Sequence, residues 1–335
     1  MSKFKEFNQA IHKNYTKDII VNLSPPICYR YRCEFRYMNN RYVMFNDNKK
    51  IYIKKLNIAA KPIQKIMPLL LQEINKYNEI KEKLYQINFR SNSLNQVTVS
   101  LIYHKQVNNN LTKNIIKLSD AYDININIRS KKFLYSVNSK YIEDILIYKN
   151  LKTYQTDTCF YQPNIYLLNK MISKVMSFTK KPKDLLELYC GVGTFSLPLS
   201  FIFNKVLVTE NNRSSIRCLN KALINNNIKN ISYGRLSSSE VVKFFEGKNF
   251  YRMRDTNINQ YNFSHVLVDP PRSGLTMDVI KFISKFKNIL YISCSPETYL
   301  RDIQLLKKHK ITNIEIFDQF PNTKHFEIIS ALSVN

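Results

Sequence analysis

The chain has 335 residues, 44% of them hydrophobic, so it can bury one large core or two of ordinary size and is not disordered overall. Its longest apolar stretch, from Phe195 to Phe203, is too short to span a bilayer, and the first ten residues lack the apolar core of a signal peptide. We therefore expect a soluble, cytoplasmic protein with no membrane partner. The six cysteines lie scattered without a CxxC pair, which argues against a disulfide framework or a metal site.

An excess of basic residues gives a net charge of +26, from 51 Lys and Arg against 25 Asp and Glu. Such an excess favours a polyanion as partner, because Lys and Arg neutralise phosphates. The runs KNIIK, DININIR and INNNIKNI offer a second explanation, since an AT-rich genome favours Lys, Asn and Ile without any function. That bias does not favour Arg, so the arginines near residue 30 are the stronger indication of a partner.

Strand-like alternation of apolar and polar residues dominates the first 160 residues. It predicts strands over 29–38, 41–46, 83–89 and 96–104, and helical spacing of apolar residues predicts a helix over 62–77. Arginines alternate with aromatic residues in the first two of these strands. The pattern predicts an α+β domain over residues 1–160 that is built around an antiparallel sheet.

Strands and helices alternate in residues 161–335. We predict strands over 184–189, 205–210, 231–234, 265–271 and 288–294, with helices between them, including one over 194–203. Such alternation implies right-handed crossovers and a mostly parallel sheet. Two consecutive strands at the end, 313–320 and 326–334, imply an antiparallel edge. The fold class predicted for this half is α/β, a Rossmann-like methyltransferase domain with a seven-stranded, mostly parallel sheet.

The segment ELYCGVGTFSL places Gly191 and Gly193 between a buried strand and a helix, where the backbone can turn sharply against a ligand. Glu210 ends the next strand, where a carboxylate can bind ribose hydroxyls. Ser196 occupies the position of the third glycine of a dinucleotide site, so the segment favours S-adenosyl-L-methionine over a nicotinamide cofactor. The alternative is a plain turn without a ligand, against which Glu187 argues, because burying a carboxylate without a partner is costly.

Two motifs follow the next strands of the predicted sheet. VDPPRSG places Asp269 at the carboxyl end of a strand, where open α/β sheets bind their ligands. Many adenine and cytosine amino-methyltransferases have an aromatic residue where this chain has Arg272, which argues against that class. ISCSPET places Cys294 just past the following strand.

A cysteine at this position suits methylation of uracil. A thiolate that adds to carbon 6 turns the ring into an enolate whose carbon 5 can take a methyl group, and a base must then remove the carbon 5 proton. We expect Cys294 to lie near positive potential or a helix N-terminus that favours the thiolate, and the helix after Pro296 can provide the latter. The alternative is a core cysteine without chemistry.

The segments LLELYCGVGTFSL, VDPPRSGL, YISCSPET and FDQFPNTKHFE together resemble the RNA uridine-5-methyltransferase family. YRYRCEFR, KLYQINF, VSLIYHK and FYQPN are similar to its bacterial tRNA-specific members, so the resemblance covers nearly the whole chain. It implies that S-adenosyl-L-methionine donates a methyl group to the uridine at position 54 in the T loop of tRNA. The product would be ribothymidine, formed through a covalent cysteine–uracil adduct.

The resemblance also implies roles for single residues. Cys294 matches the nucleophile of the family, and Glu327, in KHFE, matches its base. The positions that match cofactor and active-site residues are Gln162, Tyr189, Gly191, Gly193, Thr194, Glu210 and Asp269. Thr194 departs from the usual Asn and lacks its amide, and Ser295 makes SCSP of the more usual SCNP.

Relatives that act on ribosomal RNA usually carry a four-cysteine iron–sulfur motif and an added N-terminal barrel, and this sequence has neither. The resemblance therefore favours the T arm of tRNA, or another RNA with a similar loop, as the partner of a monomer. Arg30, Arg32 or Arg36 would contact phosphates, and a base would stack on Tyr85, unless these are solvated strand residues without a partner. Two alternatives are a ribosomal RNA uridine-5-methyltransferase and a tRNA-binding or folding factor without catalysis, against which Cys294 and Glu327 argue.

Overall fold

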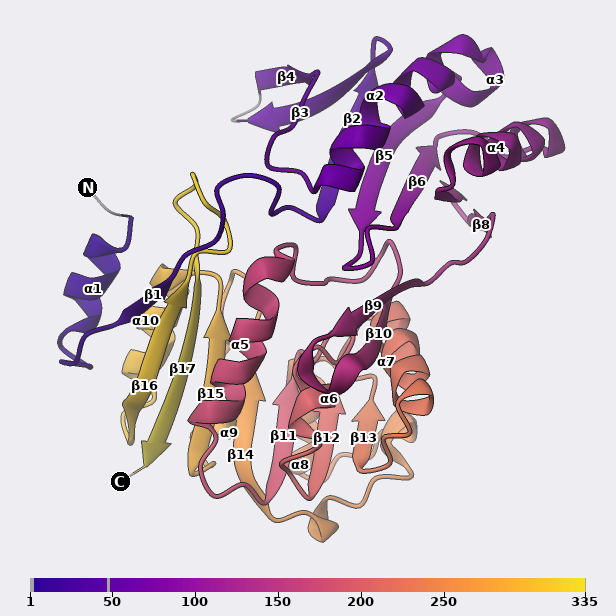
Figure 1. The fold of residues 1–335 in the computed structure, drawn as a ribbon. Coiled ribbons are helices and arrows are strands. Elements are labelled where there is room, and N and C mark those ends of the chain that lie inside the picture. The colour runs from indigo at the N-terminus through magenta and orange to yellow at the C-terminus, as the bar shows by residue number, and fades with distance from the viewer. Residues whose placement is uncertain (1–2, 47–48, 335) are drawn as a thin grey trace. The chain divides into compact units, whose positions relative to one another are not determined.

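The computed structural model describes residues 3–46 and 49–334, which form two compact units (Figure 1). The large unit comprises residues 1–24, 145–162 and 166–335, and the small unit comprises residues 25–144 and 163–165. The sequence predicts a single boundary near residue 160. The structure differs, because the N-terminal helix and strand, and the segment from residue 145, pack in the large unit.

The small unit is built on a seven-stranded sheet, counted over the described residues, in the order β4-β3-β2-β5-β6-β7-β8. The strands are β2 (Arg32–Met38), β3 (Arg41–Asn46), β4 (Lys49–Ile53), β5 (Leu84–Ser91), β6 (Val97–Tyr103), β7 (Asn125–Ser130) and β8 (Phe133–Ser136). The helices are α2 (Lys61–Lys76), α3 (Asn78–Lys81) and α4 (Asn109–Tyr122). Neighbouring strands are antiparallel except β6 and β7, which run parallel because α4 connects them.

Alternation along β2 separates the two faces of this sheet. Cys33, Phe35 and Tyr37 are buried in the core of the small unit, whereas Arg32 and Arg36 lie on the opposite face. Successive side chains of a strand point to opposite faces, so the arginine–aromatic alternation of the sequence places the aromatic rings inside. The predicted helix and four predicted strands are all present, and the structure adds others.

The large unit is built on a sheet of eight strands within the described residues, in the order β1-β16-β17-β15-β14-β11-β12-β13. The strands are β1 (Ile20–Asn22), β11 (Asp184–Leu188), β12 (Lys205–Thr209), β13 (Ile231–Gly234), β14 (Phe263–Val268), β15 (Asn288–Ser293), β16 (His309–Phe317) and β17 (Glu327–Val334). All pairs are parallel except β15–β17 and β16–β17. This confirms the predicted α/β fold with an antiparallel edge.

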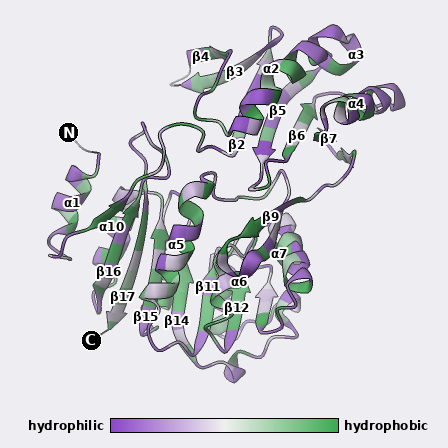
Figure 2. Ribbon diagram, viewed as in Figure 1, coloured by the Kyte–Doolittle hydropathy of each residue, from purple (hydrophilic) through white to green (hydrophobic). Residues whose placement is uncertain are grey.

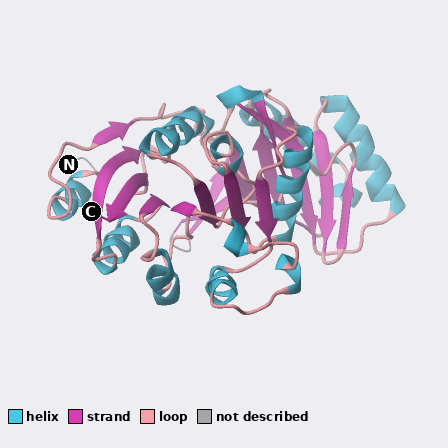
Figure 3. Ribbon diagram, turned by 90° about the horizontal axis from the view of Figure 1, so that it is seen from below, coloured by secondary structure: helices cyan, strands magenta, loops and turns pink. Residues whose placement is uncertain are grey.

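Helices lie on both faces of this sheet (Figures 1 and 3). They are α1 (Lys5–Ile11), α5 (Ile165–Phe178), α6 (Ser196–Leu199), α7 (Arg213–Asn225), α8 (Ser238–Phe245), α9 (Met277–Ile283) and α10 (Pro296–Leu305). A two-stranded sheet of β9 (Ile142–Leu146) and β10 (Leu151–Gln155) and three short 3₁₀ helices, Tyr148–Asn150, Tyr251–Met253 and Ile258–Gln260, complete the secondary structure of the described residues. Strands β11 and β12 are mostly hydrophobic because both of their faces are covered (Figure 2).

Two features of the large unit differ from the prediction. Helix α6 spans only four residues, where the sequence predicts a helix over 194–203, and the residues after it form turns. Strand β1 adds an eighth strand, which lies parallel to β16. No helix among the described residues is both long and apolar enough to cross a membrane.

A buried polar contact fixes β1 to the sheet. The Asn22 side-chain amide donates to the Glu315 carboxylate at 2.9 Å and to the Ile316 carbonyl at 3.0 Å. Glu315 also forms an ion pair with Lys174 of α5 at 2.6 Å. Asn22 and Glu315 are both buried, at 2% and 4% exposure, so water does not reach the Glu315 carboxylate freely. The Asn22 amide therefore supplies a hydrogen bond that water would otherwise provide.

We predict that Asn22→Ala lowers the free energy of unfolding by about 2 kcal/mol, because a buried carboxylate loses a hydrogen-bond donor. Ile20→Ala, in the same strand but with 57% of its side chain exposed, should change it by less than about 0.5 kcal/mol. Urea-induced unfolding measures both variants. Equal losses in the two would show that this hydrogen bond does not fix β1.

Candidate active site

The strand order of the large unit reverses at β11, because β12 lies on one side of it and β14 on the other. Open α/β sheets bind ligands at such a switch point, beyond the carboxyl ends of the strands. The loops after β11, β12, β14 and β15 all leave the sheet at this edge, since these strands are parallel. Tyr189, Glu210, Asp269 and Cys294 are the residues that follow these four strands at or near their ends.

The glycine turn after β11 contains three residues with positive φ angles, a backbone conformation that residues other than glycine seldom adopt. Tyr189, Gly191 and Gly193 have φ angles of 61°, 56° and 89°. A Cβ on Gly193 would lie 2.5 Å from Leu219 of α7, so this glycine allows the turn to pack against that helix. A Cβ on Gly191 would meet nothing within 4 Å, so Gly191 faces open space that a ligand can fill.

Glu210 connects the ends of β11 and β12. One oxygen of its carboxylate accepts from the Gly191 N–H at 3.1 Å, and the other accepts from the Asn212 N–H at 2.6 Å. The Asn212 side chain in turn donates to the Thr158 carbonyl at 3.2 Å, which fixes the segment before Gln162 to the start of α7. These contacts hold the Glu210 carboxylate beside the open space at Gly191.

Gln162 and Thr194, two further positions predicted to contact a cofactor, are both buried. The side-chain oxygen of Gln162 has no hydrogen-bond partner in the part of the chain that the structure describes, although the residue is only 3% exposed. Buried polar atoms in proteins are nearly always paired, so an unpaired buried acceptor is a candidate ligand contact.

Strand pairing places Cys294 beside Glu327. Ser293, the last residue of β15, lies opposite Ile328 of the antiparallel strand β17. One residue further along each strand, Cys294 and Glu327 therefore come next to each other at the edge of the sheet. Cys294 is partly exposed, whereas Glu327 is 3% exposed and its Oε2 has no hydrogen-bond partner in residues 3–46 and 49–334.

Three carboxyl groups gather at this edge, of which Glu187 and Glu327 are buried and Asp269 is half-buried. Burial raises the pKa of Glu187 and of Glu327 to about 8, and the pKa of Asp269 to about 7. The charge of Asp269 raises the pKa of both glutamates further, which means that it lies close to each. The Ser196 hydroxyl donates to Glu187 at 2.5 Å and opposes this shift.

The environment of Cys294 differs from the sequence prediction. A helix does begin at Pro296, two residues beyond it, and Arg272 lowers its pKa. Burial nevertheless raises the pKa of Cys294 to about 11, and the charges of Glu327 and Asp269 add to that increase. The expected helix N-terminus and positive charge are therefore present near Cys294, but burial and the charges of Glu327 and Asp269 outweigh them, so the protein alone does not favour the thiolate.

Helix α10 fixes the loop that carries Asp269 and Arg272. Asp302, which is fully buried, accepts from the Leu275 N–H at 2.8 Å and from the Tyr291 hydroxyl at 2.6 Å. Arg301 donates to the carbonyls of Ser273 and Leu275, each at 3.1 Å. Asp302 is a structural residue that we did not predict from the sequence, although a carboxylate on the apolar face of a predicted helix can indicate such a residue.

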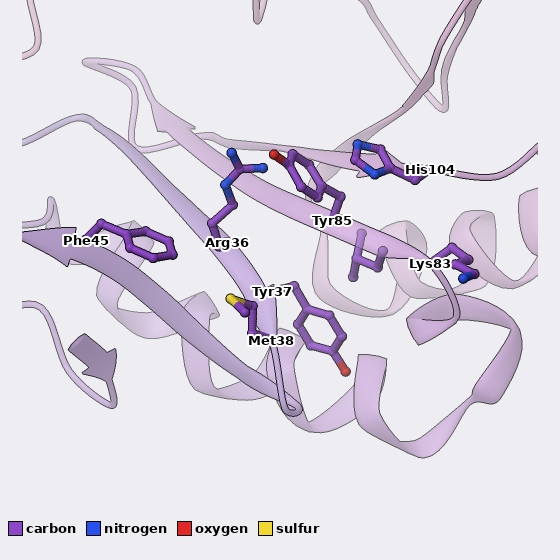
Figure 4. Close-up of a pocket in the computed structure, with 8 residues that line it drawn as sticks. Arg36, Tyr37, Met38, Phe45, Lys83, Tyr85 and His104 are labelled. Carbon is purple, nitrogen blue, oxygen red and sulfur yellow. The ribbon is translucent and has the colours of Figure 1, made fainter. Parts of the chain in front are cut away.

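In the small unit, the side chain of Tyr85 lies between two others (Figure 4). The Arg36 guanidinium lies 3.6 Å from the centre of its ring, and the His104 ring stacks on it with centres 3.9 Å apart. The register between β5 and β6 shifts between Leu84 and Gln86, so Tyr85 occupies a bulge. The structure thus brings together two of the predicted RNA contacts, Arg36 and Tyr85.

These side chains line a hollow of about 640 Å³, and a second hollow of about 870 Å³ shares His104 with it. Arg129, Lys131 and Lys132 line the second hollow. The two other predicted RNA contacts are placed differently, because Arg30 donates to the Arg32 carbonyl at 3.0 Å and Arg32 forms an ion pair with Glu34. Arg36 is therefore the arginine of this group that faces a hollow.

The charges around Cys294 predict its reactivity in the protein alone. Alkylation of Cys294 by iodoacetamide should be slow at pH 8 and accelerate about tenfold per pH unit until near its pKa, because only the thiolate reacts. Glu327→Gln should accelerate alkylation at pH 9, since it removes a negative charge, and Arg272→Gln should slow it. Peptide mass spectrometry measures the rates, with Cys28, which is also partly exposed, as the internal reference. Unchanged rates in both variants would contradict this arrangement.

Comparison with known proteins agrees with this architecture. A family model described as tRNA (Uracil-5-)-methyltransferase matches residues 1–333. A Campylobacter lari protein named tRNA/tmRNA (uracil-C(5))-methyltransferase is 38% identical over 332 residues, which are 96% of this chain and 95% of the relative. A Saccharophagus degradans protein of the same name is 36% identical over 323 residues, covering 92% of this chain and 88% of the relative.

Among solved structures, the Pyrococcus abyssi tRNA (uracil-54, C5)-methyltransferase in complex with S-adenosyl-L-homocysteine superimposes with a TM-score of 0.77. The match covers 98% of this chain and 82% of that chain at 20% identity, a likeness that shows the fold. The family predicted from the motifs is thus confirmed by a model that spans almost every residue. The chain belongs to the tRNA (uracil-5-)-methyltransferase family.

Proposed function

We propose that the protein methylates carbon 5 of the uridine at position 54 in the T loop of tRNA, with Cys294 as nucleophile and Glu327 as base. The observation that supports this most is the pairing of β15 with β17, which brings a partly exposed thiol beside a buried carboxyl group. Covalent activation of uracil needs one group to add to carbon 6 and another to remove the carbon 5 proton. Both groups are present at the edge where this fold binds ligands.

The substrate follows from the relatives. The curated relatives are named tRNA/tmRNA (uracil-C(5))-methyltransferases, and the Pyrococcus abyssi protein is named for uracil 54 of tRNA. Arg36 and His104 cover the two faces of the Tyr85 ring, so a base can stack on Tyr85 only where one of them moves aside. Arg36 with Lys131 and Lys132 offers positive charge for phosphates at the two hollows that share His104. A T loop presents unpaired bases and a bent backbone that suit such a surface.

The methyl donor we propose is S-adenosyl-L-methionine, which supplies an electrophilic methyl group when bound. The residues of the glycine turn fit it, because Gly191 faces open space beside the Glu210 carboxylate, a suitable acceptor for ribose hydroxyls. Gln162 offers its unpaired buried oxygen, and the buried carboxyl groups favour a ligand that carries positive charge. Tyr189, Gly193, Thr194 and Asp269 complete the set that would hold it.

Cys294, Glu327 and Arg272 carry out the other steps of the proposed reaction. The Cys294 thiol, which is partly exposed, gives its proton to water, and the thiolate adds to carbon 6 of uracil, which moves the electron pair of the carbon 5–carbon 6 double bond toward carbon 5. Once carbon 5 carries the methyl group, Glu327 as carboxylate removes the proton from that carbon. The electron pair released restores the double bond and expels the sulfur. Arg272 favours the thiolate in both sulfur steps, since it lowers the pKa of Cys294.

The order of these steps predicts the behaviour of a base variant. Glu327→Gln keeps the shape of the side chain but cannot accept a proton, so it should form the adduct, transfer one methyl group and release product very slowly. A covalent protein–RNA band carrying labelled methyl should accumulate on a denaturing gel. Cys294→Ala should give no band and no turnover while binding of the methyl donor stays nearly intact.

Two results would exclude these roles. Turnover by Cys294→Ala would show that catalysis is not covalent through this thiol. A wild-type rate in Glu327→Gln would show that another group removes the proton. The double variant Cys294→Ala, Glu327→Gln is the matched control, because it keeps both substitutions and should form no adduct.

A second prediction concerns the small unit. If Arg36 neutralises a phosphate, Arg36→Gln should weaken tRNA binding and flatten the log–log salt dependence by about one unit. Arg32→Gln should have a smaller effect, because Glu34 already neutralises that guanidinium at 2.5 Å. Lys307→Gln, an exposed lysine of the large unit, is the control. An unchanged slope in Arg36→Gln would mean that Arg36 does not contact phosphate.

A further inference from the structure

Lys3 contacts the loop that ends at Glu327. Its ammonium group donates to the Asp318 carboxylate at 2.5 Å, to the Phe320 carbonyl at 3.0 Å and to the His325 carbonyl at 3.1 Å. Lysine has three N–H donors, and these three oxygens use all of them. The contacts join the two ends of the loop between β16 and β17, and the side chains of Lys3 and Asp318 are only 19% and 12% exposed.

The helix that follows Lys3 packs against both catalytic segments. Phe4 and Phe7 of this N-terminal segment lie edge-on to Phe326, with ring centres 5.3 and 5.6 Å apart, and Phe326 directly precedes Glu327. Phe7 also contacts Tyr299 of α10, the helix that begins just after Cys294, with ring centres 6.1 Å apart. Phe7 is buried in the core of the large unit, which fixes the position of α1 there.

The loop from 318 to 326 is irregular, so the contacts with Lys3 contribute to its order. Thr323 makes hydrogen bonds within this loop: its N–H and hydroxyl both donate to the Phe320 carbonyl, and its hydroxyl accepts from the His325 N–H. Asn322 has a φ of 66°, a conformation that residues other than glycine seldom adopt. The Lys3 ammonium adds a contact to each end of this short, irregular segment.

The position of the Glu327 carboxyl group depends on that segment. Its Oε2 has no hydrogen-bond partner among the described residues, so packing and the backbone on either side determine where it points. On the β17 side the backbone is fixed by the sheet, and on the other side it is fixed by the loop. A base displaced by about 1 Å transfers protons far more slowly.

We propose that Lys3 is a positioning residue for the reaction, which holds the loop 318–326 so that Glu327 reaches the carbon 5 proton. The proposal rests on the proposed function for the role of Glu327. It also gives the N-terminal segment a role beyond the core, because Lys3, which precedes α1, contacts the loop before Glu327, and Phe7 of α1 packs against both catalytic segments.

The test compares three full-length variants. Lys3→Met keeps the length and apolar stem of the side chain but removes the ammonium group, Lys3→Arg restores a donor, and Lys5→Met removes an exposed lysine two residues away. Lys3→Met should lower kcat about tenfold, with the KM for tRNA nearly unchanged, and labelled-methyl adduct should accumulate. Hydrogen exchange of peptides covering 318–327 should accelerate about tenfold. Lys3→Arg should restore much of both, and Lys5→Met should change neither.

Each outcome decides a separate claim. Unchanged exchange in Lys3→Met would overturn the anchoring of the loop, and faster exchange with an unchanged kcat would overturn its importance for Glu327. A lower kcat without adduct would place the effect before proton removal and also overturn the proposal. If Glu327→Gln itself forms no adduct, the proposed role of the base fails, and the exchange measurement still decides whether Lys3 anchors the loop.

Discussion

The antiparallel pairing of β15 and β17 is the constraint on which the site depends. In a purely parallel sheet, all strands end at the same edge, and a strand can offer only its last residues to a ligand there. Because β17 runs in the opposite direction, its first residue, Glu327, reaches that edge and meets Cys294, which follows the last residue of β15. One edge of the sheet can therefore present both a nucleophile and a base.

The burial that brings these groups together also changes their protonation. Glu187, Asp269 and Glu327 have folded pKa values above those of the unfolded chain. These groups favour folding below their unfolded pKa values, near 4, and that contribution is lost as pH rises toward 7 or 8. Burial and the charges of Glu327 and Asp269 raise the pKa of Cys294, so its thiol is mostly protonated at neutral pH in the protein alone. A protonated thiol reacts slowly with other electrophiles, because only the thiolate is strongly nucleophilic.

The sequence predicts the parts of this arrangement that depend on local pattern. Asp269 and Cys294 follow strands with clear apolar runs, and Gly191 lies in a recognisable turn, so their places at the sheet edge were predictable. The direction of β17 also followed from two consecutive strands. The pKa of Cys294 was not predictable, because it depends on burial and on two carboxyl groups from separate segments, Glu327 and Asp269. Strand β7 lies in DININIR, a run whose composition resembles an AT-rich bias and hides its alternation. Strand β1 and helix α1 were not predicted, because each is too short to show a clear hydrophobic pattern. Their positions are determined by packing, of β1 against β16 and of α1 against Phe326.

The central claim is that this edge of the sheet methylates carbon 5 of uridine 54 in tRNA. The most direct measurement is mass spectrometry of tRNA nucleosides and T-loop fragments from cells that lack the gene and carry either the intact protein or Cys294→Ala. The account predicts that ribothymidine at position 54 disappears on deletion, returns with the intact protein and stays absent with Cys294→Ala. Ribothymidine that persists in T-loop fragments after deletion, or that Cys294→Ala restores, would contradict it.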